Sequence, residues 1–159
     1  MNLVNRISTT AFSVILGMAL LYTSAARAGH DTETDSNDVI LAGYDAVAYF
    51  TQGKPVEGSS QYTAVYNGAI YQFSSRDNRD AFRDDPSRYA PQYGGFCAYG
   101  MTFGKKFEVD GKAFEIVDGK LYVNKNKRVY KTWAKEIPQN IVAADTQWPQ
   151  VEHTPASAL

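Results

Sequence analysis

The sequence contains only one cysteine and two histidines among its 159 residues. A single cysteine excludes an intramolecular disulfide, so the folded chain must be stabilised by its buried core. A cysteine nucleophile needs an activating base, and both histidines, His30 and His153, lie in the polar ends of the chain. The sequence also lacks a C-x-x-C pair and a phosphate-binding glycine loop. These absences argue against hydrolysis and disulfide exchange, and against an enzyme in general.

The sequence lacks a hydrophobic run long enough to be a membrane anchor. The apolar stretch at 11–22 has about 12 residues, whereas a membrane-spanning helix needs about 20. It follows Arg6 and precedes Ala26-Arg27-Ala28, the pattern of a secretory signal peptide. We therefore expect residues 1–28 to be removed, and a periplasmic or secreted protein with no membrane anchor after cleavage.

No charge of one sign dominates the sequence, which has 16 basic and 17 acidic residues. Without residues 1–28 the balance becomes slightly acidic, and it offers no electrostatic surface for nucleic acid. The remaining length favours one domain. Residues 29–38 are polar and acidic and residues 150–159 are small and polar, so we expect a flexible leader, a folded domain at 39–149 and a flexible tail.

Turn and capping residues predict the first half of the domain. A short helix over 44–50 should end before Gly53, and Asn67-Gly68 between two apolar runs indicates a β-hairpin. Ser74 followed by Asp77 resembles a capping box that opens a second helix. Asp85-Pro86 should end that helix.

The second half of the domain contains two Asp-Gly pairs between alternating apolar runs. They predict a three-stranded meander over 106–109, 112–117 and 120–123. Asn124 or Asn126 can cap a following helix, and Pro138 suits the first turn of another. The expected fold is therefore a small single α+β domain, in which an antiparallel hairpin and a meander pack with several short helices.

The run YQFSSRDNRDAF at 71–82, continuing to DPSRY at 85–89, resembles the YHS domain. The longer span from Gly43 to Tyr122 resembles exported bacterial YHS-domain proteins. The resemblance implies a YHS-like fold and a possible metal function. Metal-associated YHS domains carry cysteines at positions that match Ala48, Ser74 and Asn78 here. Because none of these residues is a thiolate, the resemblance does not transfer a soft-metal site to this chain.

Cys97 lies in the glycine-rich segment YGGFCAYGM at 93–101 and has two interpretations. Free cysteines are among the most buried residues, which favours a packed core position. Alternatively, Lys105 and Lys106 lower the pKa of the thiol if they lie close to it in space, which would make it reactive. The aromatic residues Tyr93, Phe96 and Tyr99 with Cys97 form a candidate ligand pocket.

Copper is the candidate cofactor. Cys97 and Met101 are a thiolate and a thioether that suit Cu(I), and His30 near the new N-terminus can help to chelate Cu(II). We therefore expect an exported, non-catalytic YHS-like module that binds a metal ion or an unknown small ligand. The alternatives are a thiol redox protein that acts through Cys97 with a protein partner, and a structural or interaction domain in which Cys97 is buried.

Overall fold

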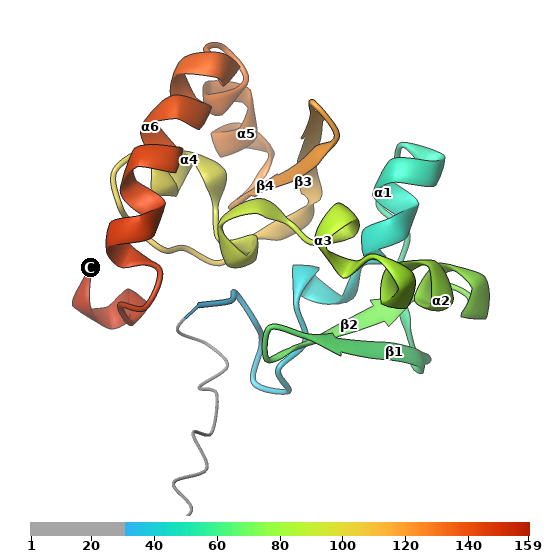
Figure 1. The fold of residues 1–159 in the computed structure, drawn as a ribbon. Helices are drawn as coiled ribbons and strands as arrows, with labels where there is room; N and C mark the ends of the chain where they lie inside the picture. Colours follow the sequence, from blue (N-terminus) through green and yellow to red (C-terminus); the bar gives the residue numbers. More distant parts are fainter. Residues whose placement is uncertain (1–30) are drawn as a thin grey trace, which may run out of the picture.

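The computed structural model describes residues 31–159, and the predicted signal peptide and His30 lie outside them. The described chain is a small α+β domain, as predicted (Figure 1). No helix in this part of the chain is long and apolar enough to cross a bilayer. The elements in order are η1 (Leu41–Gly43), α1 (Ala46–Gln52), β1 (Ser59–Tyr66), β2 (Ala69–Phe73), α2 (Arg76–Asp84), α3 (Pro86–Tyr89), η2 (Gln92–Gly95), α4 (Ala98–Met101), β3 (Asp110–Val117), β4 (Lys120–Asn124), α5 (Lys127–Trp133), α6 (Ile137–Val151) and η3 (Ala156–Ala158).

The strands form two separate antiparallel hairpins, β1–β2 and β3–β4. The predicted turn at Asn67-Gly68 is confirmed, and both of its residues have positive φ, 48° and 79°. The turn at Asp118-Gly119 has the same character, with φ of 50° and 73°. Figure 1 shows β3–β4 with α4, α5 and α6 on one side of the molecule and β1–β2 with α1 and α2 on the other, with α3 between them.

The predicted strand over 106–109, the first of the three-stranded meander, is wrong. Residues 106–109 form no strand, and Asp110-Gly111 opens β3 instead of making a turn. The reason is a set of long-range contacts. The carbonyl of Phe107 accepts a hydrogen bond from the backbone N–H of Cys97 (3.1 Å). Gly111 packs so closely under the ring of Tyr44 that an added Cβ would lie 2.3 Å from it.

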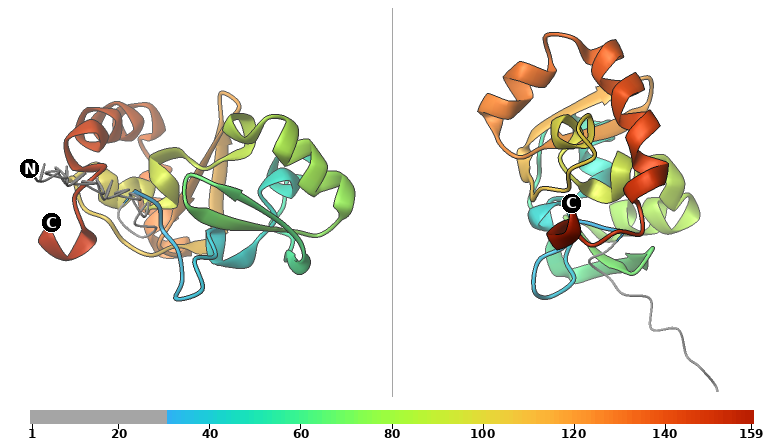
Figure 2. Two further views of the ribbon diagram at one scale, coloured as in Figure 1. Left: turned by 60° about the horizontal axis from the view of Figure 1, so that its bottom comes forward. Right: turned by 90° about the vertical axis from the view of Figure 1, so that its left-hand side faces the viewer.

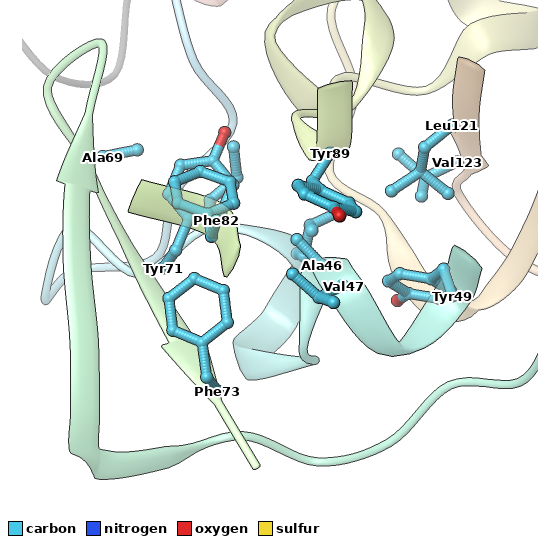
Figure 3. Packing of buried hydrophobic residues seen from close by; sticks show 12 residues of the cluster. Ala46, Val47, Tyr49, Ala69, Tyr71, Phe73, Phe82, Tyr89, Leu121 and Val123 are labelled. Atoms are coloured by element: carbon cyan, nitrogen blue, oxygen red, sulfur yellow. The ribbon is translucent and has the colours of Figure 1, made fainter. Parts of the chain in front are cut away.

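Two apolar clusters form the core. In the first, the ring of Phe82 from α2 lies 4.4 Å from that of Tyr71 and 5.1 Å from that of Phe73, both in β2 (centroid distances; Figure 3). The second cluster lies under α4, α5 and α6, with Trp133 completely buried at its centre. The β3–β4 hairpin contributes to both, because Leu121 belongs to the first and Tyr122 to the second. The two halves of the domain therefore share one strand.

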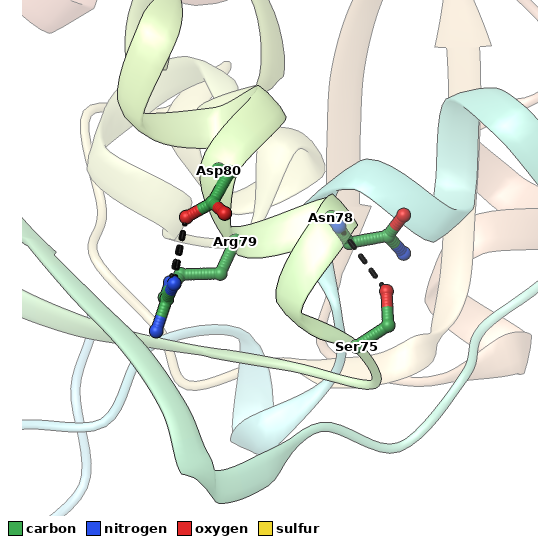
Figure 4. Close-up of polar contacts among 4 residues, drawn as sticks. All are labelled: Ser75, Asn78, Arg79 and Asp80. Carbon is green, nitrogen blue, oxygen red and sulfur yellow. Dashed lines mark hydrogen bonds and ion pairs between the residues drawn. The ribbon is translucent and has the colours of Figure 1, made fainter.

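Helix α2 begins one residue later than the sequence predicts. Its N-cap is Ser75, whose hydroxyl accepts from the backbone N–H of Asn78 (3.1 Å), and not Ser74 (Figure 4). Ser74 makes a different contact that is described below. On the outer side of the helix, Arg79 pairs with Asp80 at 2.8 Å (Figure 4). The predicted stop at Asp85-Pro86 is confirmed, and Pro86 starts α3.

Both ends of the described chain contact the same region of the domain. The backbone N–H of Glu33 donates to the carbonyl of Gly94 (2.8 Å), and a Cβ on Gly94 would lie 1.9 Å from the carbonyl oxygen of Asp31. His153 in the tail pairs with Asp31 at 3.1 Å. Figure 2 shows the tail running beside the first described residues. The flexibility of leader and tail, and the domain boundaries, stay predictions.

Candidate functional site

The three positions that match the cysteines of metal-type YHS domains converge on one buried carboxylate, that of Asp45. Its Oδ1 accepts from the backbone N–H groups of Val47 (2.9 Å) and Ala48 (3.2 Å), so Asp45 caps α1 as its N-cap residue. Its Oδ2 accepts from the backbone N–H (2.8 Å) and the hydroxyl (2.6 Å) of Ser74, and from Nδ2 of Asn78 (2.7 Å). Asp45 is completely buried.

These residues do not fit the soft-metal site of metal-type YHS domains. Ala48 offers only a backbone N–H, and the side chains of Ser74 and Asn78 both donate to the same carboxylate. Such a carboxylate has its acceptor positions filled by protein donors. The Asp45 network instead joins the start of α1, the end of β2 and the first turn of α2, so its role is structural.

Cys97 is buried, with 1% of its surface exposed. Its sulfur accepts from the backbone N–H groups of Lys125 (3.3 Å) and Gly100 (3.5 Å) and lies 3.6 Å from Oδ1 of the buried Asn124. The ammonium of Lys106 is directed elsewhere, to the carbonyls of Glu152 (2.7 Å) and Thr154 (2.8 Å). The sulfur therefore contacts backbone amides and an amide side chain.

The other predicted site residues lie in different surroundings. Met101 is buried in the second cluster, and Phe96 packs against Trp148. Tyr99 contacts the exposed ring of Phe103 edge-on. His30 is outside the described residues, and within 31–159 no three His, Cys, Asp or Glu side chains group together as metal ligands. The copper site and the four-residue pocket stay predictions.

The structure contains a cleft of about 530 Å³ that the sequence did not predict. It lies between the turn of the β1–β2 hairpin, the segment that joins α3 to η2, the first described residues and the end of α6. Of the four predicted pocket residues, Tyr93 lines it. The lining residues are Asp31, Thr32, Tyr66, Asn67, Gly68, Tyr71, Ser87, Ala90, Pro91, Gln92, Tyr93, Gly94, Trp148 and Glu152.

Thr32 is the polar lining residue with an unmet bonding requirement. Only 4% of its surface is exposed, and its Oγ1 has no hydrogen-bond partner among the described residues. The hydroxyl of Tyr93, by contrast, donates to Oδ1 of Asp145 (2.8 Å). Burial and this bond raise the pKa of Tyr93, so its hydroxyl stays protonated. Thr32 therefore lines the cleft and carries a buried hydroxyl that no group among residues 31–159 satisfies.

Glu33, next to Thr32 in the sequence, is an acid with an altered pKa. Burial, together with the charges of Glu108 and Asp35, raises the pKa of Glu33 from its usual 4.5 to about 7. Because the folded state then binds the proton more tightly than the unfolded state, protonation favours folding below pH 7. This stabilisation is complete below about pH 4.5 and is lost as the pH rises through 7.

We therefore expect the free energy of unfolding to fall by about 1–2 kcal/mol between pH 4.5 and 7.5, since partial exposure and screening reduce the ~3 kcal/mol that the full shift would give. The substitution Glu33→Gln should remove this fall. Denaturant unfolding at several pH values measures it, with the exposed Glu57→Gln as control. Parallel pH profiles for the wild type and Glu33→Gln would contradict the expectation.

Residues 47–93 match the family model of the YHS domain. The match begins within α1, covers the β1–β2 hairpin, α2 and α3, and ends at Tyr93 beside the cleft. No curated protein and no solved structure matches the chain. The family match supports, over residues 47–93, the resemblance to the YHS domain seen in the sequence.

Proposed function

We propose that this chain is an exported, non-catalytic YHS-type module that binds a small ligand in the cleft beside Tyr93. The observation that carries the proposal is the buried hydroxyl of Thr32 at the cleft, which has no partner among the described residues. An unsatisfied buried hydroxyl costs about 1–3 kcal/mol. A ligand that supplies a hydrogen-bonding atom to Thr32 would offset this cost.

The dimensions and walls of the cleft also support the proposal. Its volume of about 530 Å³ lies in the range of small-molecule sites, and such sites combine aromatic walls with a few polar groups. Tyr66 at the end of β1 and Trp148 in α6 are half-buried, and both line it. The non-catalytic part of the proposal rests on Cys97, whose buried sulfur contacts no general base within residues 31–159.

A structural role for Cys97 is the second candidate, because its sulfur joins the start of α4 to the end of β4 through Gly100 and Lys125. In that case the chain is an interaction domain. Copper binding through Cys97, Met101 and His30 remains the metal version of the main proposal. The experiment below separates these possibilities.

The test uses the mature chain with its native N-terminus, labelled for NMR. Its probes are a library of soluble aromatic and amine fragments, Cu(II) sulfate, and Cu(I) under reducing conditions. We expect fragments to shift the amide signals of Thr32 and Gly94 and the indole signal of Trp148. Ala90→Phe, which fills the cleft, should abolish these shifts, and the exposed Ala158→Phe should retain them.

Two results would overturn the cleft as the site. One is a complete absence of fragment-induced shifts at the cleft. The other is near-stoichiometric copper binding that leaves the cleft signals unchanged and is lost in Cys97→Ser or His30→Ala, which would move the function to the metal.

A further inference from the structure

We infer that the cleft selects a small organic cation, such as an amine or a methylated ammonium group. The inference rests on the proposed function, because it names the class of ligand for the same cleft. It is carried by the aromatic walls of the cleft, the sign of the charges on its lining, and an ammonium of the protein that already occupies this neighbourhood.

The aromatic walls come first. Four rings line the cleft: those of Tyr66, Tyr71, Tyr93 and Trp148. Tyr71 and Tyr93 are nearly buried, whereas Tyr66 and Trp148 retain exposed surface. The face of an aromatic ring attracts a cation through its quadrupole, and tryptophan does so most strongly. Methylated ammonium groups are therefore recognised by clusters of such rings.

The charges on the lining have one sign. Asp31 and Glu152 are acidic, and no lysine or arginine is among the described residues that line the cleft. Neighbouring charges leave an excess of negative charge. On the acidic side, Asp145 adds a third carboxylate, which accepts from the hydroxyl of Tyr93. On the basic side are the ammonium of Lys106 and the imidazole of His153, which pairs with Asp31. A cation is therefore favoured over an anion at this site.

Lys106 shows what this neighbourhood accepts. Its ammonium lies 5.4 Å from the ring centroid of Trp148 and 4.9 Å from that of Phe96, and its residue is only 5% exposed. The pKa of Lys106 is lowered, because the effect of burial exceeds the opposing effect of the Asp31 and Glu152 charges. The same two carboxylates and the same indole border the cleft. A ligand ammonium would meet the surroundings in which the protein already holds one of its own.

Thr32 adds a polar contact to this arrangement. Its hydroxyl can donate to a ligand oxygen or accept from an N–H or O–H group. A cation that also carries a hydroxyl or an N–H, such as choline or a primary amine, satisfies both features of the site. Metal ions lack such a group and gain little from aromatic walls.

The test compares cations with neutral molecules of nearly the same shape. The probes are choline with 3,3-dimethylbutan-1-ol, and benzylammonium with benzyl alcohol, each titrated into the mature chain and followed by NMR at Thr32, Gly94 and Trp148. We expect each cation to bind about tenfold more tightly than its neutral counterpart, and its affinity to fall with added salt. Glu152→Gln should weaken the binding of the cations several-fold and leave the binding of the neutral probes unchanged. The exposed Glu57→Gln should change the binding of neither class of probe.

Thr32→Val removes the hydroxyl at nearly constant shape. It should weaken the binding of both choline and 3,3-dimethylbutan-1-ol, because each carries a hydroxyl. Thr132→Val, on the exposed face of α5, is its control. Neutral probes that bind as tightly as the cations would overturn the inference but leave the proposed function standing. If neither pair of probes binds but other fragments bind in the cleft, the inference is likewise overturned and the proposed function stands. If no fragment of any kind binds in the cleft, both the inference and the proposed function are overturned.

Discussion

Replacing Asp45 with alanine is expected to lower the free energy of unfolding by about 3–5 kcal/mol. The buried carboxylate accepts five hydrogen bonds, and its loss leaves the donors of Ser74 and Asn78 and the first amides of α1 without an acceptor. Hydrogen bonds to a charged group are stronger than neutral ones, so the cost exceeds that of an ordinary helix cap. Chemical denaturation monitored by circular dichroism measures the change.

Two further variants sharpen this prediction. Asp45→Asn keeps an oxygen that can cap α1, but its amide group would face the donors of Ser74 and Asn78, so we expect a smaller yet clear loss. The exposed Asp84→Ala should change stability by less than about 0.5 kcal/mol. A loss below 1 kcal/mol in Asp45→Ala would show that the network does not hold the three elements together.

The Asp45 network also separates the contacts that a local sequence pattern predicts from those that it does not. Its cap on the first helix is a local feature, because it joins Asp45 only to the backbone N–H groups of residues two and three positions away. Its bonds to Ser74 and Asn78 span about thirty residues, and no local pattern predicts them. The family resemblance identified these positions as those that carry cysteines in metal-type YHS domains, but it did not indicate that Ser74 and Asn78 donate to one shared carboxylate.

The same difference between local and long-range contacts explains which predicted turns are correct and which one is wrong. The turns at Asn67-Gly68 and Asp118-Gly119 form as expected, because the residues that need positive φ are themselves in the turn. Asp110-Gly111 has the same composition but lies in a strand. Its glycine is required by the ring of Tyr44, which is distant in sequence. A glycine at a close approach and a glycine in a turn look alike in the sequence.

The sequence did not predict the cleft for the same reason, because its lining residues come from segments that are far apart in the sequence. Thr32 belongs to the predicted leader and Trp148 to the end of the predicted domain, and both line the cleft only because the leader packs on Gly94 and Trp148 packs near Tyr93. Of the four residues in the predicted pocket, Tyr93 lines the cleft, whereas Phe96, Cys97 and Tyr99 are not among its lining residues. The predicted pocket combined residues that are neighbours in the sequence, whereas the cleft combines residues from distant segments. A polar leader and a polar tail gave no signal that they would border a binding site.

Cys97 is expected to react with a thiol probe at least about a thousandfold more slowly in the native protein than in denaturant. Its sulfur is buried and accepts hydrogen bonds from Lys125 and Gly100, so labelling requires the region around α4 to open. For a domain with the usual stability of about 5 kcal/mol or more, the open fraction is below about one in a thousand. Reaction with a chromogenic disulfide, with and without denaturant, measures the ratio.

The matched control places a thiol on the surface of the same protein. Ala158→Cys in a Cys97→Ser background exposes one cysteine in the last turn of the chain, and it should react at nearly the same rate with and without denaturant. If native Cys97 instead reacts within a factor of ten of this control, the sulfur is accessible. The thiol redox interpretation would then replace the structural one, because an oxidising partner could reach Cys97 without unfolding the domain.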